Sequence, residues 1–254
     1  MVATSPSADD IREALAGHGL SLRGGLQPDP ALDQLLVLPG GQSAGVVWMV
    51  GVVGAAHWAS FSASSFFADG LPDPLDRWSQ AIGDELALRW GGVALYPFSG
   101  PPYWPFQQWA SRAEPLQNSP LMLRIDPVYG LWHAYRFALA LPDASPASLA
   151  APVEQPPSGL GSLCLQCDGQ PCLQACPVSA FEGASYRVDA CLDWLQQPGS
   201  EPCIQQGCLA RRACPVGVAY RYPTDVAAFH MKAFVDHHRP VPAPVSSFPA
   251  GPEA

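Results

Sequence analysis

Between residues 164 and 177 the chain reads Cys164-Leu-Gln-Cys167-Asp-Gly-Gln-Pro-Cys172-Leu-Gln-Ala-Cys176-Pro177, a C-x2-C-x4-C-x3-C-P pattern. Four more cysteines follow, and the last is again followed by proline: Cys191, Cys203, Cys208 and Cys214. The first 163 residues contain no cysteine. This abrupt change of composition predicts a boundary between a cysteine-free domain and a small cysteine-dense domain.

The first four cysteines are spaced almost as in the bacterial two-cluster ferredoxin pattern, C-x2-C-x2-C-x3-C-P, with two extra residues in the middle loop. In that pattern the cysteine before proline ligates the other cluster. Two Cys-Pro ends therefore predict a reciprocal exchange of ligands between two 4Fe-4S clusters. One cluster is expected on Cys164, Cys167, Cys172 and Cys214, and the other on Cys176, Cys191, Cys203 and Cys208. Such a domain would transfer single electrons.

Two other uses of the eight cysteines stay open. Two tetrahedral zinc sites of four cysteines each would also be served by short paired spacings, although zinc does not account for the two Cys-Pro ends. Disulfides are the second alternative, and they do not suit a chain expected in a reducing compartment.

Composition argues against several partners. The net charge is -9, and the only lysine is Lys232, so the chain lacks the basic surface that a nucleic-acid partner requires. The longest stretch without charge, residues 34–68, is interrupted by glycines and a proline, which argues against a membrane-spanning helix. The first ten residues lack the pattern of a signal peptide, so a cytoplasmic location is expected.

The hydrophobic pattern before the cysteines indicates an α+β domain. The expected helices are residues 9–18 and 73–90, the second ending at two glycines, and a third helix, 225–236, follows the cysteines after a capping Thr224. Strands are expected at 35–38, 46–53 and 93–96, and an antiparallel pair, 121–125 with 132–141, around the turn 126–130. The expected divisions are a domain over 1–142, a Pro/Ala/Ser-rich connector over 143–158, the cluster domain over 159–222 and a helix with a tail over 223–254.

The cysteine order resembles that of the epoxyqueuosine reductases and, more loosely, the reductive dehalogenases. A quartet ending in Cys-Pro is followed by a lone cysteine in Ala-Cys191-Leu-Asp-Trp-Leu and by an irregular trio ending in Cys-Pro. The resemblance implies that Cys191 completes the second cluster, and that the clusters deliver electrons to a cobalamin held by the preceding domain. It also implies an electron donor such as a ferredoxin, a flavodoxin or a flavin reductase.

A second resemblance lies in Ile125-Asp-Pro127-Val-Tyr129-Gly130-Leu-Trp132-His-Ala134-Tyr-Arg136. This stretch is similar to the P-x-aromatic-G-x-W-x-A-x-R turn of the cobalamin-processing CblC proteins and to the equivalent turn of epoxyqueuosine reductases. The resemblance implies a flavin-reductase-like antiparallel sheet with flanking helices, followed by a dicluster ferredoxin-like module. Gly130 would let a flat corrin ring approach the backbone, with Tyr129 and Trp132 as apolar walls. A plain hairpin with core aromatics is the alternative.

The aromatic run over residues 96–109 is expected to give a second wall of this pocket, with Phe98, Ser99 and Tyr103. Phe98 stands where epoxyqueuosine reductases carry a proton-donating aspartate, so queuosine chemistry is not expected. The expected function is that of a corrinoid reductase or a cobalamin-dependent reductase, and a dicluster electron carrier without a corrinoid site is the alternative function. The histidines are not expected to be catalytic. We expect His57 and His133 to be core residues, and the histidines on or after the last helix to be surface residues: His230, His237 and His238.

Overall fold

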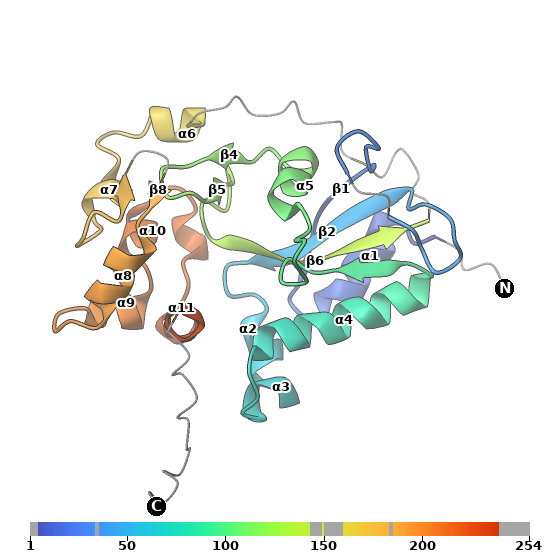
Figure 1. Ribbon diagram of the computed structural model, residues 1–254, viewed down its shortest axis with the longest axis horizontal. Helices are drawn as coiled ribbons and strands as arrows, with labels where there is room; N and C mark the ends of the chain where they lie inside the picture. Colours follow the sequence, from blue (N-terminus) through green and yellow to red (C-terminus); the bar gives the residue numbers. More distant parts are fainter. Residues whose placement is uncertain (1–4, 34–35, 143–148, 150–159, 183–184, 239–254) are drawn as a thin grey trace, which may run out of the picture.

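The strand β2 (Val46–Val53) lies inside a four-stranded sheet of order β1-β2-β6-β3, in which every neighbouring pair is antiparallel. The other strands are β1 (Ser21–Leu26), β3 (Val93–Leu95) and β6 (His133–Leu141). The computed structural model describes residues 5–33, 36–142, 149, 160–182 and 185–238 (Figure 1). In this part of the chain no helix has the length and hydrophobicity needed to cross a membrane.

Both faces of the sheet are covered, which explains why β2 is apolar at nearly every position. Trp48 and Val50 pack on one face with helices α1 (Ala8–Ala16) and α4 (Pro74–Trp90), whereas Val47 and Met49 pack on the other with α5 (Phe106–Ala113) (Figure 1). Successive side chains of a strand point to opposite faces, so one continuous apolar run serves both layers.

Short elements connect this sheet to the rest of the chain. Helices α2 (Trp58–Ser62) and α3 (Ser65–Ala68) follow β2, and a two-stranded hairpin is formed by β4 (Gln117–Asn118) and β5 (Arg124–Ile125). We call residues 5–142 the sheet region.

The remaining elements are short and surround the cysteines. We call residues 160–222 the cysteine region, and α11 (Thr224–His238) follows it and packs on α9 (Glu201–Gln206). The elements of the cysteine region are α6 (Ser162–Leu165), α7 (Pro171–Gln174), β7 (Phe181–Glu182), β8 (Ser185–Tyr186), α8 (Val188–Leu195), α9 (Glu201–Gln206), α10 (Leu209–Ala213) and the 3-10 turn η2 (Val218–Tyr220).

The α+β class is confirmed, and so are most of the long elements. The expected helices 9–18, 73–90 and 225–236 appear as α1, α4 and α11, and the expected strands 46–53 and 93–96 appear as β2 and β3. The helix α4 begins at Pro74, which suits a first-turn position, and ends at Trp90, where Gly91 caps it in the left-handed conformation. The predicted connector, 143–158, lies outside the described residues except for Leu149, which packs against the core.

Two predicted strand assignments are wrong. Residues 121–125 do not pair with 132–141: β5 pairs with β4, whereas β6 pairs with β2 and β3. The turn itself is present, since Asp126 and Gly130 exchange two backbone hydrogen bonds of 2.9 Å. The predicted strand 35–38 contributes only the isolated bridge between Val37 and Ser43 among its described residues. The strand β1 was not predicted, because two glycines interrupt its apolar pattern.

Candidate metal centres

Four thiols from α6, α7, the loop between them and the end of α10 lie together at one centre. Burial, together with the neighbouring thiols of Cys214, Cys172 and Cys167, raises the pKa of the Cys164 thiol to about 11. A neighbouring thiol opposes ionisation only over a short distance, so these four side chains are close in space. We call them the first thiol group.

The local sequence explains how the first thiol group is assembled. Gln170 adopts a left-handed conformation with φ of 40°, and Pro171 then starts α7. The side-chain amide of Gln170 donates a 3.3 Å hydrogen bond to the backbone carbonyl of Cys164, which connects this loop to α6. At the other end, Cys214 leaves α10 with extended backbone before Pro215, so its side chain returns to residues 50 positions earlier in the chain.

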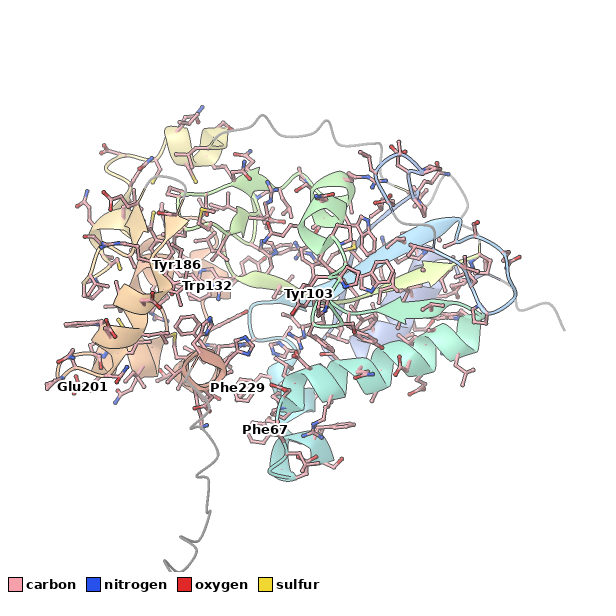
Figure 2. The ribbon with its side chains drawn as sticks, in the orientation of Figure 1. Phe67, Tyr103, Trp132, Tyr186, Glu201 and Phe229 are labelled. Atoms are coloured by element: carbon pink, nitrogen blue, oxygen red, sulfur yellow. The ribbon has the colours of Figure 1, made fainter. Side chains whose placement is uncertain are left out.

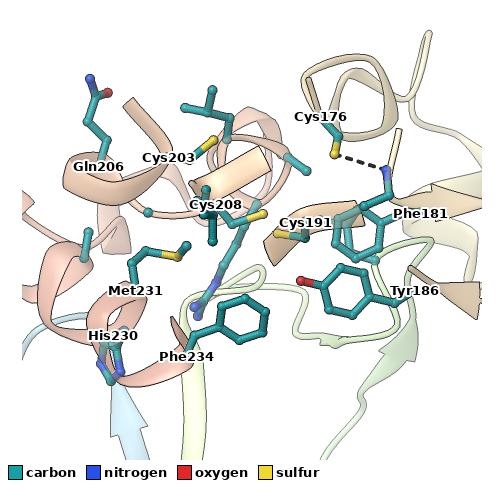
Figure 3. A pocket seen from close by; sticks show the side chains of 18 of the residues that line it. Cys176, Phe181, Tyr186, Cys191, Cys203, Gln206, Cys208, His230, Met231 and Phe234 are labelled. Carbon is teal, nitrogen blue, oxygen red and sulfur yellow. Dashed lines mark hydrogen bonds between the residues drawn. The ribbon is translucent and has the colours of Figure 1, made fainter. Parts of the chain in front are cut away.

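The other four thiols form a second centre beside a cavity of about 340 Å³. Burial raises the pKa of the Cys191 thiol, with Cys176 and Cys203 as further neighbours, and the pKa of Cys208 is raised by burial and by Cys191 and Cys176. All four of these side chains line the cavity, as Figure 3 shows. We call Cys176, Cys191, Cys203 and Cys208 the second thiol group.

Hydrogen-bond donors point at several of these sulfurs. The backbone N–H of Ala180 donates to the Cys176 sulfur at 3.2 Å (Figure 3), and the Tyr186 hydroxyl beside Cys191 acts to lower the pKa of that thiol. Nearby backbone N–H groups act in the same direction on the pKa of Cys172, Cys203, Cys208 and Cys214, against the larger effect of burial, which raises it. Such bonds favour the thiolate, which is the form that binds metal.

The donor set fits iron-sulfur clusters. Each centre offers four cysteine thiols, which is the ligand number of a 4Fe-4S cluster, and each is partly buried by apolar side chains. Within the described residues, no group of three or more histidine, cysteine or acidic side chains is arranged to hold a single metal ion. The thiols fall into the two groups expected from the sequence; their role as ligands stays a prediction.

The sheet region forms one wall of the first centre. Leu121, Ile125 and Leu131 are buried in the same cluster as Cys164 and Cys214. The Gln117 side chain accepts a 3.0 Å hydrogen bond from the Leu163 backbone N–H, and the Asn118 carbonyl accepts one of 3.1 Å from Gly161. The β4–β5 hairpin therefore holds the start of the cysteine region in place.

The turn 126–130 also faces the cysteine region. Gly130, with φ of 60°, lies so close to the loop after Cys214 that an added Cβ would be 2.1 Å from the Val216 carbonyl oxygen. A Cβ on Gly217 would in turn be 2.2 Å from the Tyr129 carbonyl oxygen. We call this backbone contact the glycine seam.

The aromatic side chains of the turn reinforce the glycine seam. Tyr129 packs edge-on against Tyr220, with ring centroids 4.9 Å apart, and the Arg23 guanidinium lies over its ring. Trp132 is buried and packs edge-on against Tyr222 at 5.2 Å. The Arg211 guanidinium donates to the Leu131 carbonyl at 2.9 Å and lies over the Trp132 ring. Arg23 and Arg211 were not singled out from the sequence, because their partners lie about 100 and 80 residues away.

These contacts do not fit a corrin ring against Gly130. The expectation was that the missing side chain admits a flat ligand, but the space next to Gly130 is occupied by the backbone of Val216 and Gly217. The residues expected to form the second wall have other surroundings. Phe98 stacks on Tyr96 at 5.2 Å beside the sheet core, whereas Ser99 is exposed and Tyr103 is 64% exposed. Figure 2 shows Trp132 beside the cysteine region and Tyr103 nearer the sheet.

The histidines are placed mostly as expected. His57 is fully buried and His133 is half-buried, while His237 and His238 are exposed. The expectation for His230 is wrong: its ring stacks on Tyr222 and lines the cavity of the second centre, and burial lowers its pKa to about 3. Apolar residues at helical spacing around it, such as Ala227 and Phe234, were the signal for this buried face.

The fold and the two centres together define an α+β chain with two four-thiol centres, both of which are bordered by side chains of its sheet region. Comparison with protein-family models, with curated proteins and with solved structures finds no match to this chain.

Proposed function

We propose that the chain is an electron-transfer protein with two 4Fe-4S clusters, one on each thiol group. The observation that carries this proposal is the interleaving of the two groups: Cys176 leaves the first quartet for the second centre, and Cys214 returns to the first. Both exchanged cysteines precede proline, as the ligation of two-cluster ferredoxins requires. Each bound cluster would accept and release one electron.

The exchange keeps the two centres close. Cys172 and Cys176 belong to different groups but are four residues apart, so their Cα atoms are separated by at most about 14 Å. The helix α10 joins Cys208 to Cys214, and six residues at helical rise span about 9 Å. We infer that electrons pass between the clusters through this short gap.

The finer family assignment remains our proposal. The antiparallel sheet with helices on both faces is compatible with a flavin-reductase-like scaffold followed by a dicluster ferredoxin-like module, as in the epoxyqueuosine reductases and CblC proteins that the sequence resembles. We further propose that a ferredoxin, a flavodoxin or a flavin reductase supplies the electrons. The acidic net charge is consistent with a protein partner rather than a nucleic acid.

The proposal does not include a corrinoid at the turn 126–130. Because the glycine seam fills the space beside Gly130, we favour the electron carrier over the cobalamin-dependent reductase. An anaerobic titration of the cluster-loaded protein with cob(II)alamin tests this choice. We expect the corrin absorption to be unchanged by the protein, and a saturable shift with one cobalamin per chain would restore the corrinoid proposal.

Electron paramagnetic resonance of the dithionite-reduced protein tests the two-cluster proposal. Two clusters separated by about 10 Å should interact magnetically, so full reduction is expected to give a broadened spectrum that one isolated cluster does not produce. A colourless protein with no signal at any stage of reduction would rule the proposal out.

A further inference from the structure

The Arg23 guanidinium is buried between two carboxyl groups of the sheet region. Its Nε atom lies 2.9 Å from the side chain of Glu114, which follows α5, and its Nη2 atom donates a 3.1 Å hydrogen bond to Asp126 in the turn 126–130. The exposed fractions of the side chains are 2% for Arg23, 14% for Glu114 and 7% for Asp126. We call these three residues the Arg23 cluster.

The Arg23 cluster contains more acidic groups than basic groups. Further ionisable groups lie beside it on β6 and in the turn 126–130: Tyr129, His133 and Tyr135. The tyrosines cannot carry a positive charge, and burial together with the Arg23 charge lowers the pKa of His133 to about 4. On α5, Arg112 is paired with Asp33 instead. With both carboxyl groups ionised, the cluster would hold one net negative charge away from water, which is unfavourable.

Glu114 is the group that can take up a proton and make the cluster neutral. The Asp126 carboxylate already accepts hydrogen bonds from Arg23 and from two backbone N–H groups of its own turn. The Glu114 carboxylate has two donors among the described residues, Arg23 and the Tyr135 hydroxyl. Burial raises the pKa of Glu114, and the Asp126 charge adds to this effect, whereas Arg23 and Tyr135 oppose it.

The cysteine region contacts the Arg23 cluster through Tyr129. The Arg23 guanidinium lies 4.7 Å from the centroid of the Tyr129 ring, and the same ring packs edge-on against Tyr220. Tyr220 belongs to η2, close in the chain to the glycine seam. Loss of the Tyr220 contact would expose the Tyr129 ring and admit water beside Arg23, which would weaken the effect of burial on Glu114.

We propose that the Arg23 cluster is a buried proton-binding site, in which Glu114 holds one proton at pH values where an exposed glutamate is ionised, and that contact with Tyr220 strengthens the binding of this proton. The site involves no cluster chemistry, so it is independent of the proposed function. By linkage, the bound proton stabilises the contact between the cysteine region and the sheet region. This contribution is complete below about pH 4.5, the ordinary value for glutamate, and is lost as the pH rises through the raised pKa of Glu114.

Infrared spectroscopy of the cluster-loaded protein over a series of pH values tests the site, because a protonated carboxyl group has a C=O stretching band that a carboxylate lacks. We expect one such band to persist at pH values where the bands of the surface acids have disappeared. The persisting band should be absent from Glu114→Gln. Glu85→Gln is the matched control and should retain the band, because Glu85 is exposed on α4.

Two substitutions near Glu114 should move the persisting band in opposite directions. Tyr220→Ala removes the contact with Tyr129, so the band should disappear at a lower pH than in the wild type. Tyr135→Phe removes a hydroxyl donor that favours the carboxylate, so the band should disappear at a higher pH. The proposal is overturned if no band persists beyond those of the surface acids, if the band survives in Glu114→Gln, or if Tyr220→Ala leaves it unchanged or shifts it in the same direction as Tyr135→Phe.

Discussion

Gly130 has a different role from the one its sequence context indicates. The turn 126–130 was predicted from Asp-Pro and Gly, and these residues do form it: the buried Asp126 carboxylate accepts the backbone N–H groups of Val128 and Tyr129. The partner of Gly130 could not be predicted, because a local turn signal says nothing about a loop 86 residues later in the chain. Gly130 therefore allows close contact between the sheet region and the cysteine region, and it does not open a space for a ligand.

Gly130→Ala should destabilise the folded protein. The new Cβ would meet the Val216 carbonyl oxygen at 2.1 Å, and alanine would also be strained at a φ of 60°. We expect the free energy of unfolding to fall by about 1–3 kcal/mol, measured by urea denaturation of the cluster-loaded protein. Gly17→Ala is the control, since no atom lies within 4 Å of its added Cβ and its φ is -62°. Equal effects of the two variants would contradict the glycine seam.

His57 should make stability depend on pH. Burial and, to a smaller extent, the Arg136 charge lower its pKa to about 4. The unfolded chain therefore binds a proton at His57 below about pH 6.5, where the folded protein still resists protonation. Stability from the neutral ring is therefore complete above pH 6.5 and is lost as the pH falls towards 4. Between pH 7 and pH 5 the contribution should decrease by about 2 kcal/mol.

His57→Phe isolates this effect. Phenylalanine can retain ring packing against Trp58 and Trp78 but does not titrate. Urea denaturation at a series of pH values should show a shallower loss of stability for the variant than for the wild type, and parallel curves would show that His57 does not titrate as proposed.

For single elements, the spacing of apolar residues in the sequence predicted the helices and strands whose buried face follows that spacing. The helix α4 and the strand β2 were predicted with nearly their observed bounds. In α4 the buried residues, which include Trp78 and Trp90, recur at helical spacing, and in β2 the buried Trp48 belongs to a continuous apolar run. The pairing of strands was less predictable. The strand β5 pairs with β4, because the bridge between Asp126 and Gly130 does not continue into a ladder between β5 and β6. Register between distant segments depends on contacts that a local pattern does not contain.

The helix α10 carries the exchange of ligands, and two substitutions at its ends test it. Cys208→Ala should remove the cluster of the second group, whereas Cys214→Ala should remove that of the first, although only six residues separate them. Cys167→Ala, far away in sequence, should reproduce the effect of Cys214→Ala. The reduced-state spectra of the three variants decide the assignment. If Cys214→Ala instead matched Cys208→Ala, the interleaving would be wrong.

For the whole molecule, the number and order of the cysteines predict two centres from the sequence alone, because two Cys-Pro ends imply an exchange that uses all eight residues. The sequence could not show that the sheet region closes over the first centre, nor that α11 and His230 complete the cavity of the second. These arrangements join segments far apart in the chain, and their contacts, such as those of Arg211 with Leu131 and Trp132, have no local signature.

Metal and sulfide analysis tests the central claim of two 4Fe-4S clusters most directly. Protein purified without oxygen and reconstituted with iron and sulfide should contain about eight iron atoms and eight acid-labile sulfides per chain, because two cubanes on eight cysteines require them. The same sample should contain almost no zinc. Recovery of about two zinc ions per chain and no sulfide would contradict the account and would assign the two thiol groups to tetrahedral zinc sites.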